Sequence, residues 1–136
     1  MNKSRIALAA AAAIALSSMA LTRPADAATP TELLAAYAAR SARAPSAEQG
    51  KAFFAMPHGR DWSCATCHGV SPATEGRHAV TGRSIQPLAP GANPTRFMDR
   101  DKADKWFGRN CGDVVGRACT DAEKADVLAW LITLKP

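Results

Sequence analysis

The sequence of 136 residues lacks the features of several large protein classes. It shows no internal repeat and no second domain, and no long low-complexity tract follows the first 27 residues. Segments that alternate apolar and polar residues are almost absent, which argues against a β-sheet protein. No stripe of basic residues interleaved with aromatics occurs, and aromatics make up only 6% of the chain. A nucleic-acid-binding surface is therefore excluded.

The one long apolar run lies at the N-terminus, from Ile6 to Leu21. Two basic residues precede it and the small-residue site Ala25-Asp26-Ala27 follows it, which is the pattern of a secretory signal peptide. A transmembrane anchor is the competing interpretation, but the run is rich in alanine, and spanning needs about 20 strongly apolar residues. We predict a signal peptide at residues 1–27, cleaved after Ala27, and one mature domain at residues 28–136 that does not span the membrane.

Export determines how charge and cysteine are interpreted. Cleavage removes three basic residues and one acidic residue, so the formal charge falls from +5 to +3. The signal has bacterial proportions, which predicts the periplasm as the compartment. Disulfides persist in such an oxidising compartment.

Two of the four cysteines lie in the segment Asp61-Trp62-Ser63-Cys64-Ala65-Thr66-Cys67-His68. This segment contains C-x-x-C-H, the attachment signature of haem c. The two thiols add to the haem vinyl groups, and the adjacent imidazole binds iron as the proximal ligand. We therefore predict one covalent haem on Cys64 and Cys67, with His68 as an iron ligand.

Three other interpretations of the cysteines compete with haem. A thioredoxin-like redox pair requires a βαβ pattern that the chain lacks. A zinc site built from Cys64, Cys67, Cys111 and Cys119 has an unusually wide second gap and gives His68 no role. Two structural disulfides would require a tight Cys64–Cys67 bridge and again leave the histidine unexplained.

The remaining segments predict short helices. The sequences Ser46-Ala47-Glu48-Gln49 and Thr120-Asp121-Ala122-Glu123 are capping boxes, which predict one helix through Phe54 and a second through Leu134. Further helices are expected at residues 30–44, ending before Pro45, and at residues 99–109. The segment at residues 70–93 is rich in proline and glycine and predicts irregular chain around one haem edge.

This arrangement resembles the class I cytochrome c fold, an all-α architecture of short helices around one haem. In that fold a glycine, here Gly50, lets the first and last helices cross closely beside aromatic side chains, here Phe54. Val127 and Trp130 are the expected partners on the last helix. The resemblance also implies a proline whose carbonyl orients the proximal histidine, and Pro87 matches that position best, with Pro90 close by.

The sixth iron ligand is not evident from the pattern. An ordinary class I carrier supplies a methionine before the last helix, but residues 106–120 contain none. Met56, Met98, His58 and His78 are the remaining candidates. Core or surface packing is the favoured role of the two methionines, and a propionate or solvent contact is the favoured role of the two histidines.

Asn110 is the remaining polar side chain in this region, and it precedes Cys111 directly. A Cys111–Cys119 disulfide would close a short loop and stabilise it by roughly 2 to 3 kcal/mol. Asparagine also ends helices well, so spacing alone does not separate an iron ligand from a helix cap.

Several motifs together resemble the sphaeroides haem protein family, over about residues 48–134. They are Asp61-Trp62-Ser63 before C-x-x-C-H, then Val80-Thr81-Gly82-Arg83, Pro87-Leu88-Ala89-Pro90, Asn93-Pro94 and Trp106-Phe107-x-Arg109-Asn110-Cys111. The resemblance implies that Asn110 is the sixth iron ligand and that Cys111 and Cys119 form a disulfide. It also implies that reduction opens the distal site to O2 or NO, with CO as a further diatomic ligand. It also implies dihaem or membrane b-type cytochromes as redox partners. A weak, hard amide donor suits ferric iron better than ferrous iron, in agreement with this implication.

Two alternatives remain open at this point. One is a plain low-spin electron carrier with methionine or histidine on iron. The other is a haem enzyme acting on peroxide or nitrogen oxides, for which the sequence supplies no recognisable acid and base pair. A binding and electron-transfer protein, not an enzyme, is the favoured interpretation.

Overall fold

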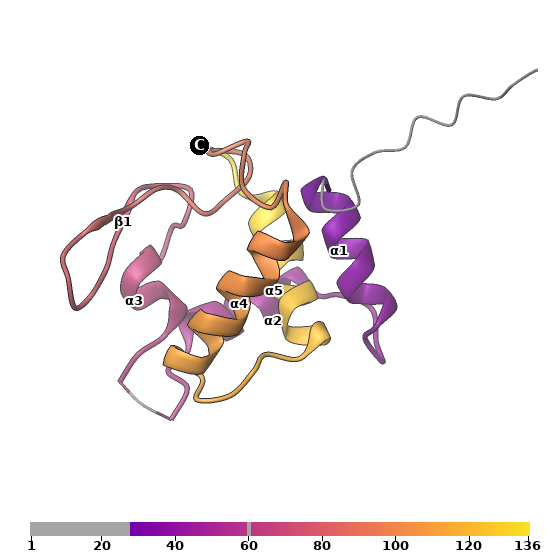
Figure 1. The fold of residues 1–136 in the computed structure, drawn as a ribbon, viewed down its shortest axis with the longest axis horizontal. Helices are drawn as coiled ribbons and strands as arrows, with labels where there is room; N and C mark the ends of the chain where they lie inside the picture. Colours follow the sequence, from indigo (N-terminus) through magenta and orange to yellow (C-terminus); the bar gives the residue numbers. More distant parts are fainter. Residues whose placement is uncertain (1–27, 60) are drawn as a thin grey trace, which may run out of the picture.

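The computed structural model describes residues 28–59 and 61–136. The predicted signal peptide at residues 1–27 lies outside the described residues, so its cleavage stays a prediction. Within the described part the elements are α1 (Pro30–Ala39), α2 (Ala47–Ala55), α3 (Cys64–His68), β1 (Gly76–Arg77), β2 (Ser84–Ile85), α4 (Arg100–Val114) and α5 (Asp121–Thr133) (Figure 1). The all-α prediction is confirmed, because the strands are two residues each. None of the helices in this part is long and apolar enough to cross a membrane.

Local capping explains where the helices begin. Thr120 and Glu123 form the predicted capping box of α5, each side chain accepting a backbone N–H from the other residue at 3.2 and 2.8 Å. The Ser46 hydroxyl accepts the N–H of Gln49 at 3.2 Å and starts α2. The reciprocal half of the capping box predicted there is wrong, because the N–H of Ser46 donates to the Asp126 carboxylate on α5 at 2.7 Å. Helix α1 ends at Ala39, five residues before the predicted end at Ala44.

Helix α4 differs most from expectation, since it extends from Arg100 to Val114 where residues 99–109 were predicted. The loop expected at residues 106–120 therefore begins only after Val114. Gly116, with a φ of 78°, ends the helix by donating its N–H to the carbonyl of Cys111 at 3.0 Å. A left-handed glycine just past the last turn is a common helix stop. Asn110 lies inside α4, and its interpretation as a helix cap is wrong.

The predicted crossing of α2 and α5 is confirmed at Gly50. A Cβ on Gly50 would lie within van der Waals overlap of the carbonyl of Asp126 on α5, so only glycine permits this approach. Beside the crossing, the rings of Phe54 and Trp130 pack with centroids 5.0 Å apart. Both side chains are buried with Val127 and Leu131 in one core cluster.

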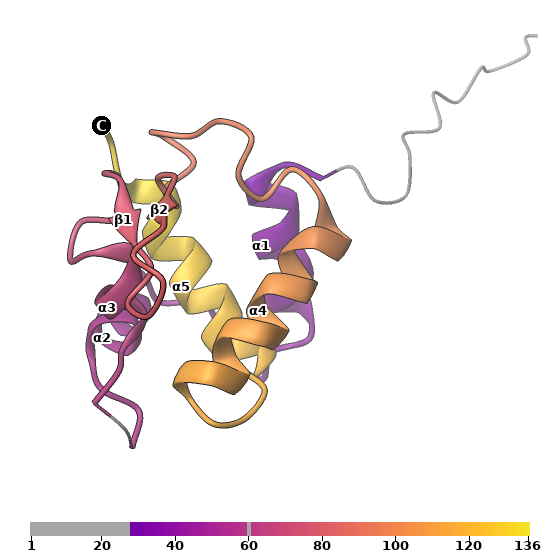
Figure 2. The ribbon, with the colours of Figure 1, turned by 60° about the vertical axis from the view of Figure 1, so that its left-hand side comes forward.

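Helix α5 lies at the centre of the molecule and separates its two sides. Helix α3 and the β1–β2 hairpin lie on one side of α5, and α4 lies on the other with α1 (Figures 1 and 2). Cys64 of α3 and Phe107 of α4 both pack against the Phe54 cluster. The core therefore fixes the position of α3, which carries His68, relative to α4, which carries Asn110.

Candidate functional site

Helix α3 consists of the predicted attachment motif, from Cys64 to His68. The backbone N–H of Ser63 donates to the Thr66 hydroxyl at 2.9 Å, which ties down the start of the helix. Residues three and four apart share a face of an α-helix, so Cys64, Cys67 and His68 present their side chains together. The spacing of the C-x-x-C-H motif therefore places its two thiols and its imidazole on one face of α3.

The His68 imidazole is electrostatically suited to bind a metal. It is half-buried, and loss of hydration lowers its pKa from the ordinary 6.5 to about 4, with a smaller contribution from the nearby Arg96 cation. The ring is therefore neutral at physiological pH, which is the form that ligates iron. Among the described residues the ring contacts Phe54 at a centroid distance of 6.1 Å and forms no hydrogen bond. Its nitrogens remain available for a ligand.

The two thiols have different surroundings. Cys64 packs against the Phe54 cluster, and burial raises its pKa to about 11. Cys67 is partly buried, and its sulfur accepts the N–H of Ala79 at 3.3 Å. Both are free cysteines, which overturns the two-disulfide alternative. No group of three or more potential metal ligands occurs among the described residues, so the predicted zinc alternative has no support there.

A loop at residues 86–96 approaches this face and is held by Arg96. The Arg96 guanidinium donates to the carbonyls of Gln86 and Pro87, both at 3.0 Å. The Pro87 carbonyl also accepts from the Asn93 amide at 3.3 Å. No hydrogen bond joins Pro87 to His68 in the described residues, so the role of Pro87 toward the histidine stays a prediction. Sequence reasoning missed Arg96, because only the folded loop brings its side chain to carbonyls nine and ten residues away.

Asn110 lies on α4, in the turn before the helix ends. Its side chain is exposed and forms no hydrogen bond among the described residues. Trp106, one turn earlier on the same stripe, is 45% exposed, which is unusual for an indole. The Arg109 guanidinium lies over the Trp106 ring, 5.8 Å from its centroid. An unpaired amide beside an accessible aromatic ring is a suitable lining for a ligand site.

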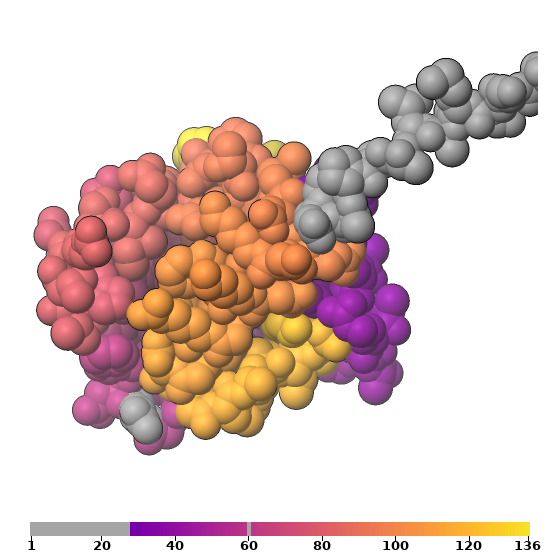
Figure 3. All heavy atoms as spheres, viewed as in Figure 1, coloured from indigo at the N-terminus to yellow at the C-terminus, as the bar shows by residue number. Residues whose placement is uncertain are grey.

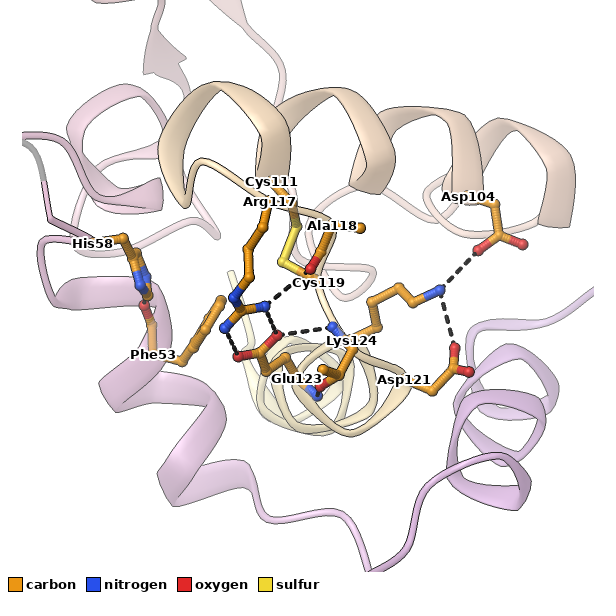
Figure 4. The surroundings of a disulfide bond; sticks show 11 residues. Phe53, His58, Asp104, Cys111, Arg117, Ala118, Cys119, Asp121, Glu123 and Lys124 are labelled. Carbon is orange, nitrogen blue, oxygen red and sulfur yellow. Dashed lines mark hydrogen bonds and ion pairs between the residues drawn. A yellow bond between two sulfur atoms is a disulfide. The ribbon is translucent and has the colours of Figure 1, made fainter.

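Cys111 and Cys119 are joined by a disulfide with a Cα–Cα distance of 5.7 Å. Cys111 is only 6% exposed, so the bridge anchors the end of α4 to the segment that leads into α5. Beside it, Arg117 pairs with Glu123 at 2.6 Å and donates to the carbonyl of Ala118 at 2.9 Å (Figure 4). The bridge restrains the residue that follows Asn110 directly.

A cavity of about 350 Å³ lies on the other flank of α4, next to Cys119. Asp104 and Gly108 line it, and helical periodicity of 3.6 residues per turn directs these residues away from Asn110. Lys124 already pairs with Asp104 at 3.4 Å and with Asp121 at 3.0 Å (Figure 4). The cavity is therefore separate from the face that carries Cys64, Cys67 and His68.

Two of the other candidate sixth ligands have partners of their own. His58 is hydrogen-bonded to the carbonyl of Phe53 at 2.8 Å and packs on its ring. The His78 imidazole accepts the N–H of Thr81 at 3.2 Å. Met56 and Met98 are 51% and 43% exposed. The structure thus gives the two histidines contacts that need no iron and leaves both methionines at the surface.

Comparison with known proteins identifies a matching family and two curated relatives. Residues 40–131 match the family described as "Domain of unknown function (DUF1924)". The cytochrome c-type protein SHP of Cereibacter sphaeroides is 46% identical over 107 residues, which cover 76% of this chain and 82% of that protein. Cytochrome c'' of Methylophilus methylotrophus is 44% identical over 94 residues, which cover 66% of this chain and 65% of the relative.

Two solved structures share the fold. Oxidised SHP, described as an oxygen-binding cytochrome c, superposes with a TM-score of 0.74 at 44% identity, covering 80% of this chain and 99% of SHP. Oxidised cytochrome c'' superposes with a TM-score of 0.70 at 39% identity, covering 79% of this chain and 95% of the relative. A solution structure of cytochrome c'' is described as giving insights into haem-ligand detachment.

Proposed function

Because this chain belongs to the sphaeroides haem protein family of c-type cytochromes, we propose that it binds O2 or NO at a haem whose sixth ligand, Asn110, is displaced on reduction. The family establishes two premises. The fold is that of a class I cytochrome c, as predicted, and the cofactor is a covalently bound haem c. The protein is thus a monohaem c-type cytochrome.

Helix α3 supplies the attachment site in this proposal. Cys64 and Cys67 hold the haem covalently, and His68 supplies the proximal imidazole. Support comes from the shared face of the three side chains and from the neutral state of the buried His68 ring. Bound haem supplies an iron centre that cycles between ferric and ferrous states and takes diatomic ligands when a coordination position is open.

The observation that carries the proposal is the position of Asn110. Its amide is exposed, has no hydrogen bond among the described residues, and lies on a helix whose end is fixed by the Cys111–Cys119 bridge. An amide oxygen is a hard, neutral donor, so it binds ferric iron better than the softer ferrous ion. Asn110 therefore acts as a ligand in the oxidised protein and withdraws in the reduced one.

The chain's own groups then determine what binds. Trp106, one turn before Asn110 on α4, offers an exposed aromatic ring beside it, and the neighbouring Arg109 is the charged group next to it in sequence. SHP is described as an oxygen-binding cytochrome c, and the solution structure of cytochrome c'' is described as giving insights into haem-ligand detachment. Both properties agree with a sixth ligand that leaves.

Electron transfer completes the proposed cycle, since reduction opens the site. The donor in this proposal is another cytochrome, of dihaem or membrane-bound b type. The predicted signal peptide places the protein in the periplasm, where both kinds of cytochrome are accessible to an exported domain at residues 28–136.

A plain low-spin carrier is the second candidate function. It requires Met98 or a histidine on iron, and the hydrogen bonds of His58 and His78 favour structural roles for both histidines. A haem enzyme is a third possibility, and turnover of peroxide or a nitrogen oxide, lost in an Asn110 variant but kept in a surface variant, would establish it.

Optical spectra of the ferric and dithionite-reduced holoprotein, before and after CO addition, test the proposal. We expect a high-spin ferrous form that binds CO at once. A low-spin ferrous spectrum that ignores CO, or a near-infrared methionine band in the ferric form, would replace the proposal by the plain carrier.

A substitution on α4 makes the assignment specific. The Asn110→Met variant should stay low-spin in both oxidation states and lose CO binding, because a thioether binds ferrous iron well. The matched control is Asp101→Met, an exposed residue in the first turn of the same helix, which should behave like the unchanged protein.

A further inference from the structure

The β1–β2 hairpin is a firmly closed loop on the side of the molecule that carries the attachment motif. Gly76 pairs with Ile85 and Arg77 with Ser84. Between the strands the N–H of His78 donates to the Arg83 carbonyl, and the N–H of Gly82 donates to the His78 carbonyl, both at 2.8 Å. A loop with this many internal bonds presents a constant surface.

The hairpin lies directly against Cys67. The N–H of Ala79 donates to the Cys67 sulfur at 3.3 Å. A Cβ on Gly76 would overlap the Cys67 carbonyl, so the backbones are in close contact there. Because a haem c would be bonded to the Cys67 sulfur, the hairpin would lie beside the bound haem at this point of attachment.

The surface of this hairpin is apolar at its tip and positively charged around it. Val80 is 70% exposed, and Val70, in the turn that precedes the hairpin, is 88% exposed. Arg77 and Arg83 are exposed three residues to either side of Val80, and residues 76–98 contain no aspartate or glutamate, although the exposed Glu75 directly precedes β1. In the space-filling view the hairpin forms an outer edge of the molecule that no other element covers (Figure 3).

We propose that the hairpin at residues 76–85 is the docking surface for an electron-transfer protein with an acidic patch, with Val80 as the apolar centre and Arg77 and Arg83 as the charged rim. This inference rests on the proposed electron-transfer role. Interfaces commonly combine an apolar core with a polar rim, and complementary charges raise association rates more than affinity. The surface therefore governs how fast electrons arrive.

The test uses reduction of the ferric holoprotein by a reduced acidic plant-type ferredoxin, followed by stopped-flow absorbance. One electron passes from the iron–sulfur cluster to the haem iron, and no proton is transferred. Arg83 has no side-chain partner among the described residues, so Arg83→Glu leaves the fold intact. We expect this change to slow reduction about tenfold at low ionic strength and to have no effect at ~1 M salt, where charges are screened.

The matched control is Lys102→Glu, which makes the same charge change at an exposed residue of α4. It should slow reduction less than about twofold, because steering depends on local charge. A second variant, Val80→Ser, should slow reduction at both ionic strengths, since apolar contacts are not screened. Equal slowing by Arg83→Glu and Lys102→Glu, or no slowing by Arg83→Glu, would overturn the docking surface.

The outcomes separate this inference from the proposed function. The Arg83→Glu variant should keep the CO-binding spectrum and the dithionite reduction of the unchanged protein. If the unchanged protein accepts no electrons from the ferredoxin and ignores CO, the proposed function itself fails. If it accepts electrons rapidly but Arg83→Glu does so equally fast, only the docking surface fails.

Discussion

Removing the Cys111–Cys119 disulfide should cost the protein about 3 to 4 kcal/mol of unfolding free energy. The bridge joins residues 8 apart, and the loop-entropy relation for a ring of that size gives about 2.5 kcal/mol. Cys111 is 6% exposed, so removing its sulfur in an alanine variant loses about 1 kcal/mol of burial. The double variant Cys111→Ala/Cys119→Ala therefore loses both contributions.

Urea unfolding of the ferric holoprotein, followed by haem absorbance at neutral pH, measures this loss. With an m value of about 1 to 3 kcal/mol per molar, the midpoint should fall by at least 1 M. The variant should also show a larger high-spin ferric fraction, because the turn of α4 that carries Asn110 is no longer tied to the start of α5. Arg117→Ala, which keeps the bridge and removes the neighbouring ion pair, is the control and should change both readouts little. A loss below about 1 kcal/mol would refute this account of the bridge.

Three further predictions follow from the described contacts. Gly50→Ala should destabilise the protein by about 3 kcal/mol because its Cβ overlaps the Asp126 carbonyl, whereas Gly108→Ala, with open space in α4, should be neutral or stabilising in the same urea assay. Arg96→Gln should lower the haem reduction potential measured by spectroelectrochemistry. The substitution removes a half-buried cation near His68, which favours the ferric state because that state carries more positive charge. An unchanged or higher potential would contradict this. Ion pairing holds the pKa of Glu123 below its ordinary value of 4.5, so its stabilisation is complete above that value and is lost as pH falls through the lowered pKa. Stability should consequently decline less steeply with acid in Glu123→Gln, and parallel curves for the two proteins below pH 5 would contradict the assignment.

Short-range patterns in the sequence were sufficient for several elements. The N-cap at Ser46, the capping box at Thr120 and the face formed by Cys64, Cys67 and His68 depend on residues at most four positions apart. Such contacts form within one helical turn, so the spacing alone predicts them. The close approach at Gly50 was predicted from the resemblance to the class I cytochrome c fold, and the structure confirms it.

Helix α4 shows where local patterns were insufficient. Gly108 and Gly112 interrupt its second half, and each glycine disfavours a helix by about 1 kcal/mol relative to alanine. The residues that compensate come from elsewhere in the fold, since Phe107 packs against Tyr37 with ring centroids 5.9 Å apart and Cys111 is buried and bridged to Cys119. Asn110 is helical for this reason.

The sequence by itself determined the attachment motif and the starts of α2 and α5, because each depends on the spacing of residues within one helical turn. Only the tertiary structure decided that Arg96 closes on the Gln86 and Pro87 carbonyls and that the hairpin lies against Cys67. Those contacts join residues about 10 positions apart or more through irregular chain, where neither helical nor strand periodicity exists to align them. The packing of the whole domain determines how these irregular segments are arranged, so no local sequence pattern predicts their contacts.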